Sequence, residues 1–257
     1  MIKIIAHRGA SGLAPENTLG AFKIAVELGA DMIELDIRPT KDQKAIVFHD
    51  KKLNRTTPIN GVVQNHYLNE LKRIDAGSWF NKKDHQSETI PTLDETIDFL
   101  KGKSEMLVEI KSERRQIENE FLHKLIKLIE KHDARDEIII QSFDSKILKR
   151  FYTLYPNYRF QKLIVWKVPF LKVQFDQRLM LENILKNPHY ESINVDHRYV
   201  TPNLVRKIHR HNKKIYCWTV NQQLRMFRLM NMGVDGIITN YPNKLKQLII
   251  KHHSQLK

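Results

Sequence analysis

Short β-rich segments alternate regularly with longer helical segments along this chain, and this alternation limits its fold more than any other feature. The β-rich segments are expected at residues 3–7, 31–37, 106–111, 137–142, 159–164, 192–196, 214–220 and 236–239. Helices are expected at residues 19–28, 93–100, 116–131, 145–155, 177–186, 202–211, 222–230 and 242–251. Repeated βα units build parallel sheets, and eight of them predict a closed (β/α)8 barrel of the TIM type.

One interruption follows the second predicted strand. Residues 44–49 form another β-rich segment, and the polar connection before it is too short for a helical crossover. This segment is therefore expected to return beside the second strand as a hairpin arm. Residues 51–91 then lose the βα pattern and are expected to form a small insertion. Barrels of about 250 residues commonly form one domain, so we expect a single domain over residues 1–257 that includes this insertion.

The first residues and the cysteine content bear on location. The sequence MIKIIAHRG has too few apolar residues for a secretory leader, and no segment reaches the roughly 18–20 apolar residues that cross a bilayer. The single cysteine, Cys217, cannot form an internal disulfide. Together these features predict a cytoplasmic protein.

The chain is strongly basic, with a formal net charge of +14. Such a charge favours anionic partners, or it reflects basic residues spread over helix surfaces. No dense Lys/Arg block is present, so a nucleic acid partner is not expected. Residues 163–175 mix apolar, aromatic and lysine side chains, and they form either a strand end with a buried loop or a lid that contacts substrate or an anionic membrane. The sequence makes no prediction of oligomeric state.

Acidic residues stand in the second and third predicted barrel strands, near the carboxyl ends where such barrels carry their working residues. Glu34 and Asp36 are two apart in a strand and therefore face the same side. Together with Glu109 they form an oxygen-rich set suited to Mg²⁺ or Ca²⁺. The alternatives are ion pairs with bases such as Arg38 or Lys111, and a glycosidase-like pair of acid and base carboxyl groups.

Two histidines and two basic residues are expected beside these carboxylates. His7 ends the first strand and His49 ends the hairpin arm. A pair of imidazoles suits acid and base catalysis at an ester bond, although a single histidine at a strand end is more often structural. Arg8 offers a planar fork for a phosphate group, and Lys111 offers a point charge. Gly9 is expected to keep the backbone clear for a ligand.

These residues fall in motifs that resemble the glycerophosphodiester phosphodiesterase family. The motifs are HRG (residues 7–9), PENT (15–18), E-x-D (34–36), HD (49–50), L-x-R-T-T (53–57), PTLDE (91–95), EIK (109–111), QSF (141–143), WTVN (218–221) and GVDGIITNYP (233–242). They follow one another in the family's order and span nearly the whole chain. Each motif is short, but the ordered set is specific.

The resemblance implies a TIM barrel with a small insertion after the HD motif. It also implies an enzyme that hydrolyses a small-molecule glycerophosphodiester to glycerol 3-phosphate and an alcohol. A divalent metal ion, Mg²⁺ or Ca²⁺, would be held by Glu34, Asp36 and Glu109. His7 and His49 would be the acid and base catalysts.

The same resemblance implies roles for further residues. Arg8 and Lys111 would contact the substrate phosphate. Phe143 and Trp218 would form walls of the pocket, or else belong to the core. Glu16 would support the site, or else be a solvated residue before a helix. Residues 165–175 and the basic balance of the chain are not part of the family pattern, and they leave the choice of substrate open.

Two other functions compete with this one. The first is a lysophospholipase D-like enzyme of the same superfamily that acts on lysophospholipids at a membrane surface. The second is a non-catalytic barrel that binds phosphoesters, although a binder would not need two proton-transfer groups. A nucleic acid substrate would rest on charge alone.

Overall fold

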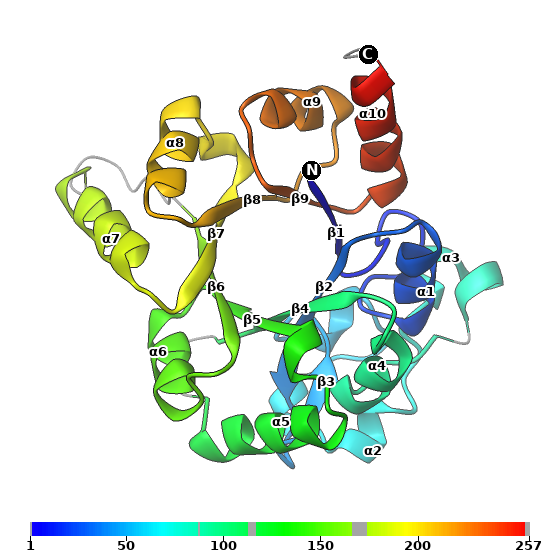
Figure 1. The fold of residues 1–257 in the computed structure, drawn as a ribbon. Helices are drawn as coiled ribbons and strands as arrows, with labels where there is room; N and C mark the ends of the chain where they lie inside the picture. The colour runs from blue at the N-terminus through cyan, green and yellow to red at the C-terminus, as the bar shows by residue number, and fades with distance from the viewer. Residues whose placement is uncertain (1, 87, 113–116, 166–173, 255–257) are drawn as a thin grey trace.

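The computed structural model describes residues 2–86, 88–112, 117–165 and 174–254. Within this part of the chain, eight parallel strands form a sheet that closes on itself, with helices around the outside (Figure 1). Closure comes from β1, which pairs in parallel with both β2 and β9. The barrel strands are β1 (Lys3–His7), β2 (Met32–Pro39), β4 (Glu105–Ile110), β5 (Ile138–Ser142), β6 (Arg159–Ile164), β7 (Tyr190–Asp196), β8 (Lys214–Trp218) and β9 (Gly236–Thr239). The predicted (β/α)8 barrel is confirmed.

Among the described residues, eight helices return the chain between the barrel strands and after the last one. They are α1 (Leu19–Glu27), α4 (Leu93–Leu100), α5 (Asn119–Lys131), α6 (Ser145–Leu154), α7 (Gln174–Lys186), α8 (Pro202–Arg210), α9 (Gln223–Asn231) and α10 (Pro242–Ser254). Polar side chains begin several of them. Thr18 accepts a hydrogen bond from the first turn of α1, and Thr92 forms a reciprocal capping box with Glu95 at the start of α4. Such caps satisfy backbone N–H groups that have no partner within the helix.

The alternation of side chains along β2 separates two apolar layers. Ile33 and Leu35 face outward and pack in the large core between the strands and the helices. Met32 faces inward and belongs to a smaller cluster inside the barrel. Because side chains alternate along a strand, Glu34 and Asp36 share the inward side with Met32. Burial of the outward isoleucine and leucine side chains therefore places two carboxylates inside the barrel.

The predicted hairpin arm and insertion follow β2. Strand β3 (Ala45–Val47) pairs antiparallel with β2, as expected from the short connection. The insertion contains two 3-10 turns and two short helices: η1 (Leu53–Arg55), η2 (Val63–Asn65), α2 (Leu68–Leu71) and α3 (Ser78–His85). The sequence did not predict these helices, because a four-residue helix shows no period and α3 is mostly polar. An insertion cluster of buried apolar side chains holds the segment together: Ile46, Phe48, Leu53, Val63, Leu71, Ile74, Ala76 and Ile90.

We expect Leu53→Ala to destabilise the protein, because Leu53 is 0% exposed within the insertion cluster. Truncating a buried leucine leaves a cavity and lowers the free energy of unfolding by about 2–5 kcal/mol. Leu224, which is 63% exposed on α9, is the control, and Leu224→Ala should change that free energy by less than about 0.5 kcal/mol. Urea unfolding followed by circular dichroism measures both. Equal effects at the two positions would contradict the packing of the insertion.

The structure bears on membrane contact in two ways. Among the described residues, no helix combines the length and the apolar composition that crossing a bilayer requires. The loop or lid predicted at residues 163–175 lies largely outside the described part of the chain, because residues 166–173 do not belong to it.

Candidate active site

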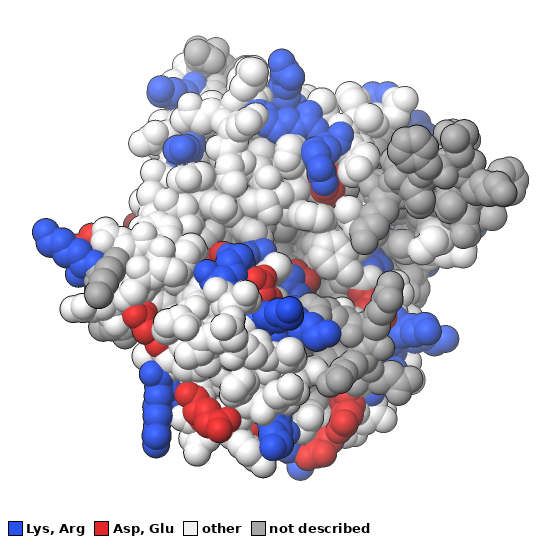
Figure 2. Space-filling view, turned by 180° about the vertical axis from the view of Figure 1, so that it is seen from behind, with Lys and Arg blue, Asp and Glu red and all other residues white. Residues whose placement is uncertain are grey.

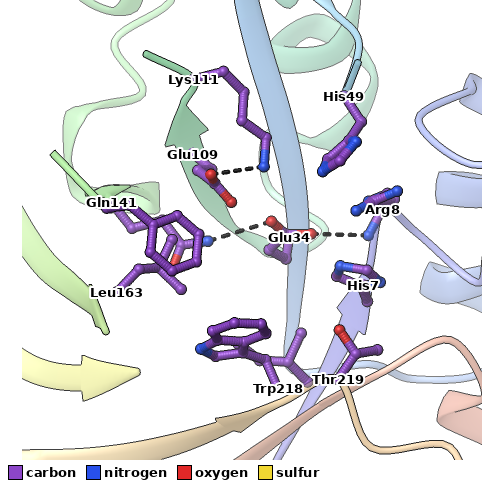
Figure 3. A pocket seen from close by; sticks show the side chains of 12 residues that line it. His7, Arg8, Glu34, His49, Glu109, Lys111, Gln141, Leu163, Trp218 and Thr219 are labelled. Atoms are coloured by element: carbon purple, nitrogen blue, oxygen red, sulfur yellow. Dashed lines mark hydrogen bonds and ion pairs between the residues drawn. The ribbon is translucent and has the colours of Figure 1, made fainter. Parts of the chain in front are cut away.

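The carboxyl ends of the barrel strands bring the predicted site residues together. In the sheet register, His7 lies beside Glu34, and Asp36 lies beside Glu109. A pocket of about 100 Å³ opens at this end of the barrel (Figure 3). It is lined by His7, Arg8, Glu34, His49, Glu109, Lys111, Gln141, Phe143, Leu163, Trp218, Thr219 and Ile238. Eight of the nine residues predicted to bind metal, catalyse the reaction or bind substrate thus line one pocket, and the ninth, Asp36, is buried beside it.

Glu34, Asp36 and Glu109 form a buried carboxylate cluster. Their exposed fractions are 3%, 0% and 5%. One oxygen from each side chain lies within 4.8 Å of the others. Three carboxylate oxygens so close together can converge on one hard divalent cation such as Mg²⁺ or Ca²⁺.

Two basic side chains partly neutralise the carboxylate cluster. Lys111 Nζ lies 2.9 Å from Asp36 Oδ1 and 2.6 Å from Glu109 Oε1. Arg8 Nε lies 3.2 Å from Asp36 Oδ2, and the Arg8 backbone N–H donates a hydrogen bond to Glu34. Pairing of the carboxylates with Lys111, which the sequence left open as an alternative to a metal site, is therefore present together with the carboxylate cluster. With all three carboxyl groups ionised, the two cations would leave one negative charge uncompensated, and a divalent cation would make the site positive, opposite to the charge of a phosphodiester.

The pKa values of the three carboxyl groups reflect this imbalance. Burial, together with repulsion from Asp36 and Glu109, raises the pKa of Glu34 well above its usual value. Burial also opposes ionisation of Asp36, but Lys111 and Arg8 outweigh it and hold the pKa of Asp36 well below its usual value. Burial raises the pKa of Glu109 despite the attraction of Lys111. A further cation in the cluster would favour the ionised form of all three.

A hydrogen bond fixes the tautomer of His7. Its Nδ1 lies 2.7 Å from Asn240 Oδ1, and an amide oxygen can only accept a hydrogen bond. Nδ1 therefore carries the hydrogen, and in the neutral ring Nε2 has the free lone pair. Burial, together with repulsion from Arg8, lowers the pKa of His7 to about 3, so the ring is neutral at pH 7. A neutral imidazole can accept a proton at Nε2.

His49 is held in the same manner by a carboxylate. Its Nδ1 lies 2.5 Å from Asp50 Oδ1. Burial, with repulsion from Arg8 and Lys111, lowers the pKa of His49 against the attraction of nearby carboxylates. In Figure 3, His49, Arg8 and His7 lie on one side of Glu34, and Gln141 and Leu163 lie on the other. Both imidazoles therefore border the same pocket as the carboxylate cluster.

Aromatic side chains form part of the pocket wall. Phe143 and Trp218 pack edge to face, with ring centroids 5.4 Å apart. Trp218 Nε1 donates a hydrogen bond to the carbonyl oxygen of Asn194, which orients the indole. Phe143 is 42% exposed and is therefore not a core residue. The structure places both aromatic residues at the pocket.

The turn after β1 brings Arg8 back over the carboxylates. Arg8 and Gly9 have φ angles of +55° and +78°. A Cβ on Gly9 would lie 2.7 Å from the carbonyl carbon of Ala21 in α1. The absence of a side chain at Gly9 therefore lets the turn lie close to α1. From the sequence, Gly9 was expected to make room for a ligand, and the structure corrects that reason. Without the close approach to α1, the turn could not pack against the first helix.

The sequence predicted no metal-binding, catalytic or substrate-binding role for three amide side chains of the site. Gln141 donates to Glu34 Oε1 at 3.3 Å, and Asn17 donates to Asp36 Oδ2 at 2.9 Å. Asn240 orients a histidine ring, as described above. All three lie in motifs of the ordered set, so the motifs were the available signal. A motif does not show which distant side chain its amide will meet.

Figure 2 shows the distribution of charged side chains on the face of the molecule that is turned away from the viewer in Figure 1. Near the middle of this face, basic and acidic side chains lie next to one another beside a hollow. Other Lys and Arg side chains are scattered towards the edge. On this face, the basic excess of the chain is spread out and does not gather into one continuous patch.

The pocket is suited to an anionic ester, because fixed cations that would bind a phosphate stand beside two imidazoles that can move protons. Fold and site together define a (β/α)8-barrel hydrolase of phosphoesters. Residues 7–244 match the Glycerophosphoryl diester phosphodiesterase family, and this chain belongs to that family. The family predicted from the ordered motifs is confirmed, and the chain is a phosphodiesterase of this class.

Relatives and a solved structure agree with this assignment. The glycerophosphodiester phosphodiesterase of Caldanaerobacter subterraneus subsp. tengcongensis is 36% identical, over 96% of this chain and 98% of its own length. The glycerophosphodiester phosphodiesterase of Bacillus subtilis is 35% identical, over 94% of this chain and 84% of its own length. A phosphodiesterase from Oleispira antarctica, solved with the product sn-glycerol-3-phosphate, has a TM-score of 0.84 and 28% identity, with 96% of each chain covered.

Proposed function

We propose that this chain hydrolyses glycerophosphodiesters to glycerol 3-phosphate and an alcohol, with a divalent metal ion and with His7 and His49 as acid and base catalysts. One observation carries the proposal: both histidines border a pocket that also holds the carboxylate cluster and two fixed cations. A protein that only bound phosphoesters would not need two imidazoles there. The Oleispira phosphodiesterase, whose structure contains sn-glycerol-3-phosphate, supports the proposed product.

Glu34, Asp36 and Glu109 would hold the metal ion. The fit rests on their chemistry, since carboxylate oxygens are the ligands that Mg²⁺ and Ca²⁺ prefer, and on the excess of carboxyl groups over basic side chains in the site. A bound divalent cation would polarise the phosphate and offset the negative charge that develops on its oxygens.

Arg8 and Lys111 would bind the phosphate. The guanidinium of Arg8 can donate two parallel hydrogen bonds to phosphate oxygens, and Lys111 supplies a compact positive charge. Both side chains are already held against Asp36. Donors that are held in place before the reaction stabilise developing charge without reorganising, which makes them effective in catalysis.

The two histidines would move protons in two successive steps. In the first, one neutral histidine takes the proton of the glycerol 2-hydroxyl, and its oxygen attacks phosphorus. The bond from phosphorus to the leaving alcohol breaks, the other histidine, protonated, gives that alcohol its proton, and a cyclic phosphate results. In the second step, water attacks the cyclic phosphate and the histidines exchange roles. Glycerol 3-phosphate forms, and both histidines regain their starting states.

A substrate panel tests this proposal. Glycerol 3-phosphate should be released from glycerophosphocholine or another glycerophosphodiester with Mg²⁺ or Ca²⁺. An analogue with hydrogen in place of the glycerol 2-hydroxyl should not react, because it lacks the internal nucleophile. Normal hydrolysis of the analogue would exclude the cyclic step. No release from any member of the panel would favour the barrel that binds phosphoesters without catalysis.

A second candidate function is lysophospholipase D-like hydrolysis. The apolar wall formed by Phe143, Leu163 and Trp218 favours it, because an acyl chain could lie against such a surface. Peripheral contact with an anionic membrane, which the net charge of +14 would favour, belongs to this candidate. Rates on lysophosphatidylcholine above those on glycerophosphocholine, with competition by anionic vesicles, would support it.

A further inference from the structure

One guanidinium group of the insertion joins two carboxylates at the edge of the pocket. Arg55 is the last residue of η1. Its Nε lies 2.6 Å from Asp50 Oδ2, and its Nη2 lies 3.2 Å from Asp50 Oδ1. On its other edge, Nη1 lies 2.8 Å from Glu16 Oε2, and Nη2 lies 2.6 Å from Glu16 Oε1. Only the planar fork of arginine can grip two carboxylates in this way.

Each of these carboxylates also holds a residue that lines the pocket. Asp50 Oδ1 lies 2.5 Å from Nδ1 of His49. Glu16 Oε1 accepts a hydrogen bond of 2.8 Å from Nη1 of Arg8. The contacts therefore run without a break from Arg8 through Glu16, Arg55 and Asp50 to His49. Arg55 is the link between the proposed phosphate-binding arginine and one of the proposed proton-transfer groups.

The turn that carries Arg55 is held by packing as well as by charge. Leu53, two residues before it, is fully buried in the insertion cluster. The Leu53 N–H donates to the carbonyl oxygen of Gly61, and the hydroxyl of Thr57 donates to the carbonyl oxygen of Leu53. The side chains of Glu16 and Asp50 are 14% and 27% exposed, so the ion pairs are partly shielded from water. The insertion thus presents Arg55 in a defined place.

We propose that Arg55 is a positioning residue that aligns His49 and Arg8 for the reaction, so that the insertion takes part in building the active site. The inference rests on the proposed function of the pocket. Without the guanidinium, Glu16 and Asp50 would lose the cation between them and turn towards water. His49 and Arg8 would then lose the carboxylates that orient them. A displacement of about 1 Å in a reacting group can lower a rate roughly 100-fold.

The test compares Arg55→Ala and Arg55→Lys with the control Arg73→Ala. Arg73 is an exposed arginine of the same insertion. Arg55→Ala should lower kcat for glycerophosphocholine by about 10- to 100-fold. Arg55→Lys should recover only part of this loss, because an ammonium group cannot bridge both carboxylates. Arg73→Ala should retain the kcat of the unaltered protein. Added guanidinium ion should raise the kcat of Arg55→Ala and leave the kcat of the unaltered protein and of Arg73→Ala unchanged.

A purely structural role would lower stability without changing the turnover of folded molecules. The rates are therefore measured well below the melting temperature of each variant and divided by the folded fraction from circular dichroism. Coupling to Asp50→Asn is the second readout. If Arg55 acts through Asp50, the double variant Arg55→Ala/Asp50→Asn should lose less activity than the product of the two single losses.

An Arg55→Ala variant with the kcat of the control, or losses that multiply in the double variant, would overturn the proposal. If Arg55→Ala does not fold, Arg55→Lys decides, because it keeps the charge: a reduced kcat supports positioning and an unchanged kcat refutes it. Failure of the unaltered protein to release glycerol 3-phosphate would instead refute the proposed function, so the two failures are distinguishable.

Discussion

His7→Ala and His49→Ala should each lower kcat by about 100- to 10 000-fold and leave the fold intact. The size of the effect follows from the proton transfers that the two imidazoles are proposed to perform, since general acid or base catalysis contributes in that range. Both side chains border the pocket, and neither belongs to an apolar cluster, so their removal costs little packing. Release of glycerol 3-phosphate from glycerophosphocholine measures the loss.

His209→Ala is the matched control for these variants. His209 is 41% exposed on α8 and pairs with Asp235, away from the residues that line the pocket. It should retain full activity, and circular dichroism should show the same folded state for all three variants. Full activity in His7→Ala or in His49→Ala would end the two-histidine mechanism.

Glu109→Gln should remove both metal binding and activity. The change replaces a buried carboxylate of the cluster with a neutral amide of nearly the same shape. We expect metal affinity to fall by more than about 100-fold, since even the loss of an outer hydrogen-bond partner of a metal ligand costs roughly 10- to 100-fold. In the unaltered protein, EDTA should abolish turnover, and Mg²⁺ or Ca²⁺ should restore it.

Thermal unfolding provides a readout of metal binding that does not depend on activity. A metal concentration 100 times the dissociation constant stabilises the folded state by about 2.7 kcal/mol. For a chain of this size, that corresponds to a rise in melting temperature of roughly 5–10 °C. Glu105→Gln is the control, because Glu105 begins the same strand and pairs with Arg159 outside the pocket. An equal rise for Glu109→Gln and the control would contradict the proposed metal site.

The barrel could be predicted because its signal is local. Along β2, apolar side chains at Ile33 and Leu35 alternate with carboxylates. This two-residue period is visible from residues that are adjacent in the sequence. The caps at Thr18 and Thr92 were predictable for the same reason, since a cap concerns only the first turn of its own helix. Short helices of the insertion, such as α2, were not predictable, because four residues cannot display a period.

The members of the candidate site could also be predicted, but their partners could not. Strand ends and ordered motifs indicated all nine residues, eight of which line one pocket. The hydrogen bond between His7 and Asn240 spans 233 positions of the chain, and nothing in either motif implies the other. The link from Arg55 to Glu16 spans 39 positions and depends on how the insertion folds over the barrel.

The sequence by itself therefore determined which strands form, which side each side chain faces and which residues gather at the carboxyl ends. Periodicity and caps act over a few residues, so they are visible without coordinates. Only the tertiary structure decided that three carboxyl groups face two cations, and that Arg55 joins Glu16 to Asp50. These contacts arise when β1 closes the barrel against β9 and the insertion packs on its own apolar cluster. Closure and packing are cooperative properties of the whole chain, and no local segment encodes them.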